Sequence, residues 1–113
     1  MATKMGEYED PRLGNGYKEP LFPGYHFANW WQGVVAGSGY QLLAGATASD
    51  QTQGVVLLIR SSPSGAFRYD QVFVTAPSRD GSLRVVSVDN GMATLMTSNG
   101  SGLTFDISQR KFL

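Results

Sequence analysis

The sequence has no cysteine and a single histidine, His26, among its 113 residues. Without cysteine the chain can form no disulfide, no thiol nucleophile and no zinc–thiolate site. One imidazole leaves too few ligands of the usual kind for a transition metal, and no run of spaced Asp and Asn residues ending in Glu resembles a calcium loop. We therefore expect no metal ion and no other cofactor.

Charge is scarce as well, because Asp, Glu, Lys and Arg make up 16% of the residues and nine acidic side chains balance nine basic ones. A net charge of zero provides no positive excess to neutralise phosphates, so nucleic acid is not an expected partner. No run of about 18 apolar residues is present, so we expect no transmembrane helix. The charged N-terminus lacks the apolar core of an intact secretory signal.

The charges that are present avoid one long stretch. Residues 21–59 carry a single charge, Asp50, whereas the twenty residues before them carry seven. Such a stretch cannot cover itself with solvated side chains, so part of its surface is expected to contact something other than water. It contains a cluster of ring-bearing residues that we take as the candidate binding residues: Phe22, Tyr25, His26, Phe27, Trp30, Trp31 and Tyr40.

Residues 1–29 lack any sustained period of 2 or 3.6 and are interrupted by Pro11, Pro20 and Pro23. Proline cannot donate a ladder hydrogen bond and biases the residue before it toward extended geometry. We therefore predict that residues 1–29 form an extended arm that lies on a surface, and that residues 30–113 form the folded domain.

From Trp30 onward, apolar and β-branched runs alternate with Gly, Asn, Asp, Ser and Pro clusters, which is typical of an antiparallel meander. No segment holds helical periodicity over three turns. The pattern predicts one all-β domain of about seven strands that closes as a barrel or a sandwich, and we favour the barrel because closure protects strand edges. The predicted strands are 30–36, 40–47, 54–60, 66–76, 82–88, 92–97 and 102–107.

Two turn signals give a more detailed prediction for the C-terminal third. Asn90-Gly91 and Asn99-Gly100 are both typical of two-residue type I′ hairpins. The resulting registers place one set of apolar side chains on the core face: Leu83, Val85, Met92, Met96, Leu103, Phe105 and Ile107. The run from Gly54 to Ile59 is apolar on both faces, so it is predicted to be covered on both.

The chain from Gln53 to Phe112 resembles small uncharacterised bacterial all-β proteins. The similarity lies in Gln53-Gly54 ahead of an apolar strand, in Thr75-Ala-Pro77 followed by Gly81-Ser-Leu-Arg-Val85, and in the closing stretch from Phe105 to Phe112. This resemblance covers about half the chain. It implies an all-β fold in proteins that are often exported, and it brings no activity to these residues.

The polar residues do not indicate a catalytic site. A Ser-His-Asp triad would need His26, which lies in the proline-broken arm rather than on a rigid element. Asp80 and Asp89 fall in turns, where Asp is favoured for local hydrogen bonds. Asp70 and Asp106 fall on strand faces near arginines, where ion pairing is the ordinary explanation.

Two adjacent tryptophans on a strand point to opposite faces, so one of Trp30 and Trp31 can face outward unless the arm folds back and covers both.

The first hypothesis is a non-enzymatic structural or assembly protein that contacts a second copy or another protein through the arm, residues 1–29, and the low-charge surface of residues 30–49. The alternative is a carbohydrate- or small-ligand-binding module with Trp30, Trp31, Tyr25 and Tyr40 as its platform. A small hydrolase that uses His26 with Asp70 or Asp106 is the third. The composition, rich in Gly, Ser, Thr and Gln, favours an exported bacterial or phage-associated protein.

Overall fold

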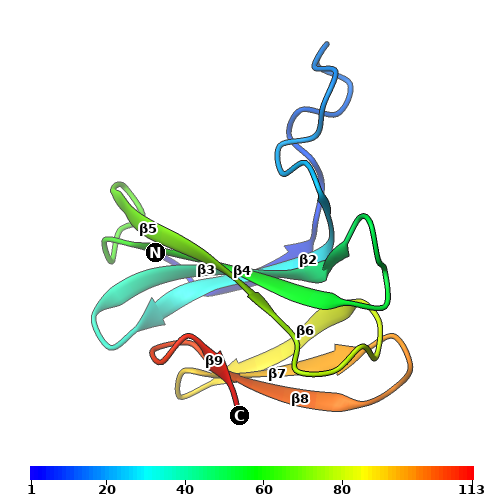
Figure 1. Ribbon diagram of the computed structural model, residues 1–113. Helices are drawn as coiled ribbons and strands as arrows, with labels where there is room; N and C mark the ends of the chain where they lie inside the picture. The colour runs from blue at the N-terminus through cyan, green and yellow to red at the C-terminus, as the bar shows by residue number, and fades with distance from the viewer.

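The computed structural model describes residues 1–113 and consists of antiparallel strands joined by turns and loops, with no helix (Figure 1). The predicted all-β fold is confirmed. Two sheets are present: sheet A has the order β1-β2-β3-β4-β5 and sheet B the order β6-β7-β8-β9. The strands are β1 (Lys4–Glu7), β2 (Tyr25–Val35), β3 (Ser38–Thr47), β4 (Gly54–Ser61), β5 (Arg68–Thr75), β6 (Leu83–Asp89), β7 (Met92–Thr97), β8 (Gly102–Asp106) and β9 (Lys111–Phe112).

The two sheets pack face to face as a sandwich (Figure 1), so the predicted barrel-like closure is wrong and its alternative holds. The chain passes from sheet A to sheet B once, through residues 76–82. Pro77 in this link has no N–H to continue the ladder, and β6 starts in the opposite layer instead of pairing with β5. Each sheet therefore keeps two edges.

The predicted arm differs from the structure at both of its ends. Residues 4–7 form β1, which pairs with residues 29–32, and β2 begins at Tyr25 rather than at Trp30. No sequence pattern predicted β1, because this four-residue strand has no apolar alternation and is ordered by pairing with the edge of β2. Residues 8–24 connect these two strands, and the middle part of this connection projects from the sandwich (Figure 1).

The main core lies between the two sheets. Alternate residues of β2, β3 and β4 meet those of β6, β7 and β8 there. As predicted, β4 is covered on both faces: Val56 and Leu58 belong to this core, whereas Leu57 and Ile59 point to the other side of sheet A. The buried core residues are Trp31, Tyr40, Leu42, Ala44, Val56, Leu58, Ala76, Leu83, Val85, Ala93, Leu95, Phe105 and Ile107.

The first hairpin prediction in sheet B is confirmed at its turn, since Asn90 and Gly91 both have positive φ and Asp89 pairs with Met92. The register then changes at a β-bulge on Val86, so that Val85 pairs with Leu95 and not with Met96. One extra residue is enough to exchange the faces of the strand beyond it.

The second hairpin prediction is wrong by one residue. Thr97 donates its N–H to the carbonyl of Ser101, so the loop holds three residues and ends on Gly100 at a φ of 95°. Met92 and Met96, which were predicted in the core, are therefore 37% and 40% exposed. Leu83, Val85, Leu103, Phe105 and Ile107 lie on the predicted core face, together with Ala93 and Leu95.

Candidate functional site

The face of sheet A turned away from sheet B, here called the outer face, carries two rows of side chains that run across the strands. Cross-strand pairing aligns Gly6, Trp30, Leu43, Leu57 and Phe73 in one row, which is aromatic and aliphatic. The next row is mostly amide and charged, and consists of Lys4, Gln32, Gln41, Ile59 and Gln71. An apolar stripe thus lies beside a polar one.

A β-bulge at Ala28 places the aromatic residues of β2 on this face. Phe27 pairs with Gly45 and Asn29 with Ala44, so Ala28 is the extra residue. Phe27 and Trp30 are three positions apart, which would put them on opposite faces of a regular strand. The extra residue at the bulge returns both side chains to the outer face, where they pack against the cluster of Leu43, Leu57 and Ile59.

Aromatic contacts tie the base of the projecting residues to the outer face. The Tyr25 ring stacks on the Phe73 ring with centroids 4.3 Å apart, and the Phe27 ring makes T-shaped contacts with Tyr8 and Phe22, each with centroids 5.6 Å apart. Burial raises the pKa of the Tyr8 phenol, and the negative charge of Asp10 adds to the effect. Tyr8 and Phe22 therefore fix the two ends of the projection.

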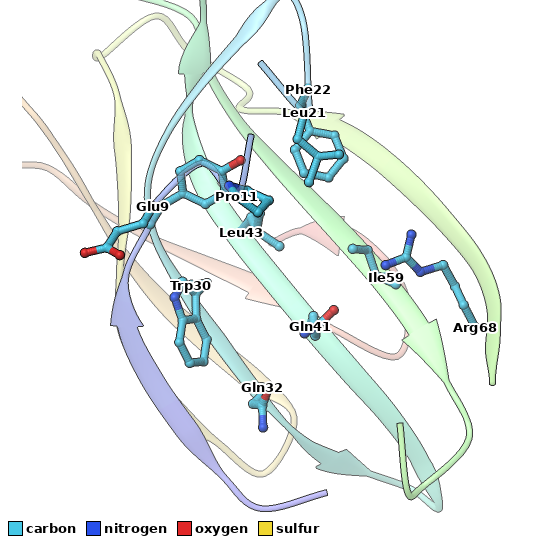
Figure 2. Close-up of a pocket in the computed structure, with 11 residues that line it drawn as sticks. Glu9, Pro11, Leu21, Phe22, Trp30, Gln32, Gln41, Leu43, Ile59 and Arg68 are labelled. Carbon is cyan, nitrogen blue, oxygen red and sulfur yellow. The ribbon is translucent and has the colours of Figure 1, made fainter. Parts of the chain in front are cut away.

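An open cleft of about 260 Å³ lies on the outer face beside this aromatic base (Figure 2). Residues from the base form one end, Trp30 and the amide row form the floor and one side, and Arg68 reaches toward the floor from the opposite side. We call it the outer-face cleft. It is lined by Tyr8, Glu9, Pro11, Leu21, Phe22, Trp30, Gln32, Gln41, Leu43, Ile59 and Arg68.

Residues 9–21, here called the projecting segment, stand away from both sheets on the outer-face side (Figure 1). The Asp10 carboxylate closes their base, because it accepts the N–H groups of both Arg12 and Leu21. Beyond the base, Leu13 is 83% exposed and Tyr17 is 62% exposed. The Arg12 guanidinium lies 4.9 Å from the Tyr17 ring centre, which is the one contact of that ring with a cation.

The seven candidate residues separate into three groups. Phe22, Tyr25, Phe27 and Trp30 come together on the outer face. The second group, Trp31 and Tyr40, lies in the main core, where each is 7% exposed. The third is His26 alone.

The alternation of the adjacent tryptophans is confirmed, with Trp31 in the core and Trp30 on the outer face. A platform made of Trp30, Trp31, Tyr25 and Tyr40 together is therefore wrong, because two of its four members face the other layer. The reason is that successive side chains of β2 and β3 point to opposite faces of the sheet.

The structure separates the residues proposed for hydrolysis. His26, at the start of β2, has its ring nitrogen 3.5 Å from the amide of Gln51. Cross-strand pairing aligns Asp70 with Gly33 of β2. Gly33 lies seven residues beyond His26 along that strand, which corresponds to about 23 Å at the usual rise per residue. Asp106 belongs to β8 of the other sheet.

Arginines hold the Asp70 carboxylate. Arg60 lies 3.0 Å and Arg110 2.7 Å from its oxygens. The hydrogen bond from Arg60 lowers the pKa of Asp70, and both positive charges act in the same direction. Arg110 comes from the turn between β8 and β9, so this carboxylate joins sheet A to sheet B.

Nine of the eleven lining residues were not among the sequence candidates. Four of them, Tyr8, Glu9, Pro11 and Leu21, come from the connection between β1 and β2, and five lie on sheet A: Gln32, Gln41, Leu43, Ile59 and Arg68. One signal pointed to them. A strand that is apolar on both faces, as residues 54–59 are, requires a second covered surface outside the main core. The sequence did not show which strands would border that surface.

Comparison of the chain with family models, with curated proteins and with solved structures produced no match. No helix long and apolar enough to cross a bilayer occurs in the structure. No three His, Asp or Glu side chains gather closely enough to share a metal ion.

Proposed function

We propose that this protein is a non-enzymatic assembly module that associates with a second copy of itself through the projecting segment. One observation carries the proposal: Leu13 and Tyr17 extend from the sandwich at 83% and 62% exposure. Burying a large apolar side chain stabilises a complex by about 1.5–3 kcal/mol, whereas the same side chain exposed on a projecting loop adds no stability to the isolated chain.

The construction of the segment supports this role. Its base is held by the Asp10 hydrogen bonds and by the packing of Tyr8 and Phe22, so the segment leaves the sheet in a fixed direction. Its tip has no contacts of its own that would bury Leu13. A pre-positioned base lowers the ordering entropy that must be overcome on association. Self-association is the commonest outcome for such a surface, since most oligomers are symmetric assemblies of one chain.

The test is the solution mass of the full-length chain by light scattering, measured over a dilution series. We expect a mass above the 12.2 kDa of the monomer, which falls to that of the monomer in a Leu13→Ser/Tyr17→Ser double variant. Leu113→Ser is the matched control, because Leu113 is 67% exposed at the other end of the chain. A full-length chain that is monomeric at every concentration contradicts the proposal.

A second variant removes the tip without disturbing the sheet. Replacing residues 12–20 by Gly-Ser-Gly keeps Asp10 and Leu21, whose hydrogen bond of 3.1 Å already brings the two ends together. A truncation that begins at Asn29 is unsuitable, because it also removes β1 and the first four residues of β2. The tip replacement is expected to be monomeric with an unchanged cooperative unfolding transition.

A further inference from the structure

The outer-face cleft combines a fixed aromatic ring with side chains that are free to form hydrogen bonds. The indole N–H of Trp30 donates to the carbonyl of Glu7 at 3.0 Å, and the ring lies over Gly6, 3.0 Å from where a Cβ atom of that residue would be. A side chain at position 6 would displace the ring. Trp30 is therefore held flat along β1, at the side of the cleft shown in Figure 2.

A ring that is already ordered is a favourable stacking platform. The face of an aromatic ring is negative, so it attracts weakly positive C–H groups laid against it. Because the Trp30 ring is fixed before any ligand arrives, stacking on it requires little further loss of side-chain entropy. Flat rings with C–H groups on one face and hydroxyl groups around the edge fit this combination.

The amide row supplies partners for hydroxyl groups. The Gln41 side chain makes no hydrogen bond within the chain, although it lies in the middle of the cleft floor (Figure 2). The Gln32 amide donates to the carbonyl of Ala2 at 3.0 Å, which leaves its oxygen as an acceptor. One amide offers both donors and acceptors, which suits a hydroxyl that can act in either role.

Arg68 is the basic member of the lining and faces the cleft from the side opposite Trp30, whereas the carboxylate of Glu9, the other charged member, is directed away from the floor (Figure 2). None of the four ion pairs in the structure includes Arg68, so its guanidinium has no carboxylate partner. Its donors are available to hydroxyl oxygens or to the carboxylate of an acidic sugar.

The position of the cleft argues against a peptide strand as its occupant. Its floor is formed by β2, β3 and β4, and each of these strands is paired on both sides. A peptide that adds to a sheet needs an unpaired edge. The floor offers side chains alone, and the volume of about 260 Å³ is just below the range of about 300–1,000 Å³ for small-molecule sites. An open cleft of this size accommodates a sugar ring with its neighbours extending outside.

We infer that the outer-face cleft binds a linear oligosaccharide, with Trp30 stacked on one pyranose ring and Gln41 and Arg68 hydrogen-bonded to its edge. The inference does not depend on the proposed assembly role, because it uses the sheet face and not the tip of the projecting segment.

The test is isothermal titration of the full-length chain with four hexasaccharides: those of β-1,4-linked glucose, of xylose, of N-acetylglucosamine and of galacturonate. We expect at least one to bind, and Trp30→Ala to weaken its binding by about tenfold or more, the equivalent of one strong aromatic contact. Arg68→Ala and Gln41→Ala are expected to weaken it by about threefold to tenfold. Arg68 is exposed, so its variant tests the site without loss of folding.

The controls separate this inference from the assembly proposal. Leu13→Ser/Tyr17→Ser changes the segment tip outside the cleft and is expected to leave the sugar affinity unchanged. Binding of none of the four sugars overturns the inference, and so does binding that survives both Trp30→Ala and Arg68→Ala. A change of solution mass in the cleft variants without any sugar binding would identify a second copy as the occupant and would also overturn it.

Discussion

The side-chain amide of Asn29 forms two hydrogen bonds with the main chain of Val85, donating to its carbonyl and accepting from its N–H, both at 2.8 Å. Asn29 belongs to β2 of sheet A, and Val85 belongs to β6, an edge strand of sheet B. At Val85 the Asn29 side chain therefore supplies the two hydrogen bonds that a neighbouring strand would otherwise supply. Both residues are buried. The amide therefore joins the two layers and closes this part of the β6 edge.

Replacing this amide is expected to be costly. In Asn29→Ala the N–H and C=O of Val85 both lose their partner in a buried position, and each unsatisfied group costs about 1–3 kcal/mol. We expect the free energy of unfolding to fall by about 2–4 kcal/mol in urea denaturation. Asn15→Ala is the control, because the side chain of that asparagine donates only to the Pro11 carbonyl in the exposed segment. Equal effects of the two substitutions would contradict the role of Asn29.

Deleting Ala28 is expected to leave the pattern of the outer face intact. Without this residue, Phe27, Asn29 and Trp30 follow one another, so regular alternation points Phe27 and Trp30 outward and Asn29 inward, and their cross-strand partners are already consecutive. The deletion removes the Ala28 carbonyl, which accepts the N–H of Tyr8 at 3.0 Å. We therefore expect a cooperative thermal transition with stability reduced by about 1–3 kcal/mol, whereas Ala28→Ser, which keeps the bulge, should change stability by less than about 1 kcal/mol. Loss of the cooperative transition in the deletion variant would show that β2 needs the bulge in order to pair.

The two bulges also explain how far the sequence could predict this fold. The alternation of apolar and polar residues was sufficient to identify the strands from Trp30 onward and the double coverage of β4, since these depend on local pattern. The extra residues, Ala28 and Val86, are neither Gly nor Pro, and nothing in their identity marks a bulge. Register beyond each of them therefore could not be predicted, and neither could the exposure of Met96.

The same limit applied to the candidate site. Local pattern identified Trp30 and its aromatic neighbours, but Gln41, Ile59 and Arg68 reach the cleft from strands that become neighbours only in the folded sheet. Tyr40 and Leu43 are both apolar members of β3, and only the packing of sheet B on one face decides which of the two is available to a ligand.

The ion pairs of Asp70 predict a dependence of stability on acid. Its pKa is lowered in the folded chain from the usual 3.8, chiefly by the hydrogen bond from Arg60. A lowered folded pKa stabilises the protein above the unfolded pKa, and this contribution is lost as the pH falls from about 5 through the folded value. We expect Asp70→Asn to have a lower melting temperature than the unmodified chain at neutral pH and a similar one near pH 2.

Asp89→Asn serves as the control for this pH dependence, because the Asp89 carboxylate forms no ion pair. Its melting temperature is expected to follow that of the unmodified chain throughout the acid range. A difference between Asp70→Asn and the unmodified chain that stays constant from neutral pH to pH 2 would show that the charge of Asp70 does not stabilise the folded chain.

The last prediction concerns the space that Trp31 needs in the main core. A Cβ atom at Gly33 would lie 2.5 Å from the Trp31 ring, and Trp31 is 7% exposed. Gly33→Ala should therefore cost about 1–3 kcal/mol, as overpacking does. At Gly102, in β8, an added Cβ meets no atom within 4 Å. Gly102→Ala should be neutral or stabilise by up to about 1 kcal/mol, because alanine restricts the unfolded chain. Urea denaturation of both variants measures the difference, and equal stabilities would mean that the ring can shift to accept a methyl group.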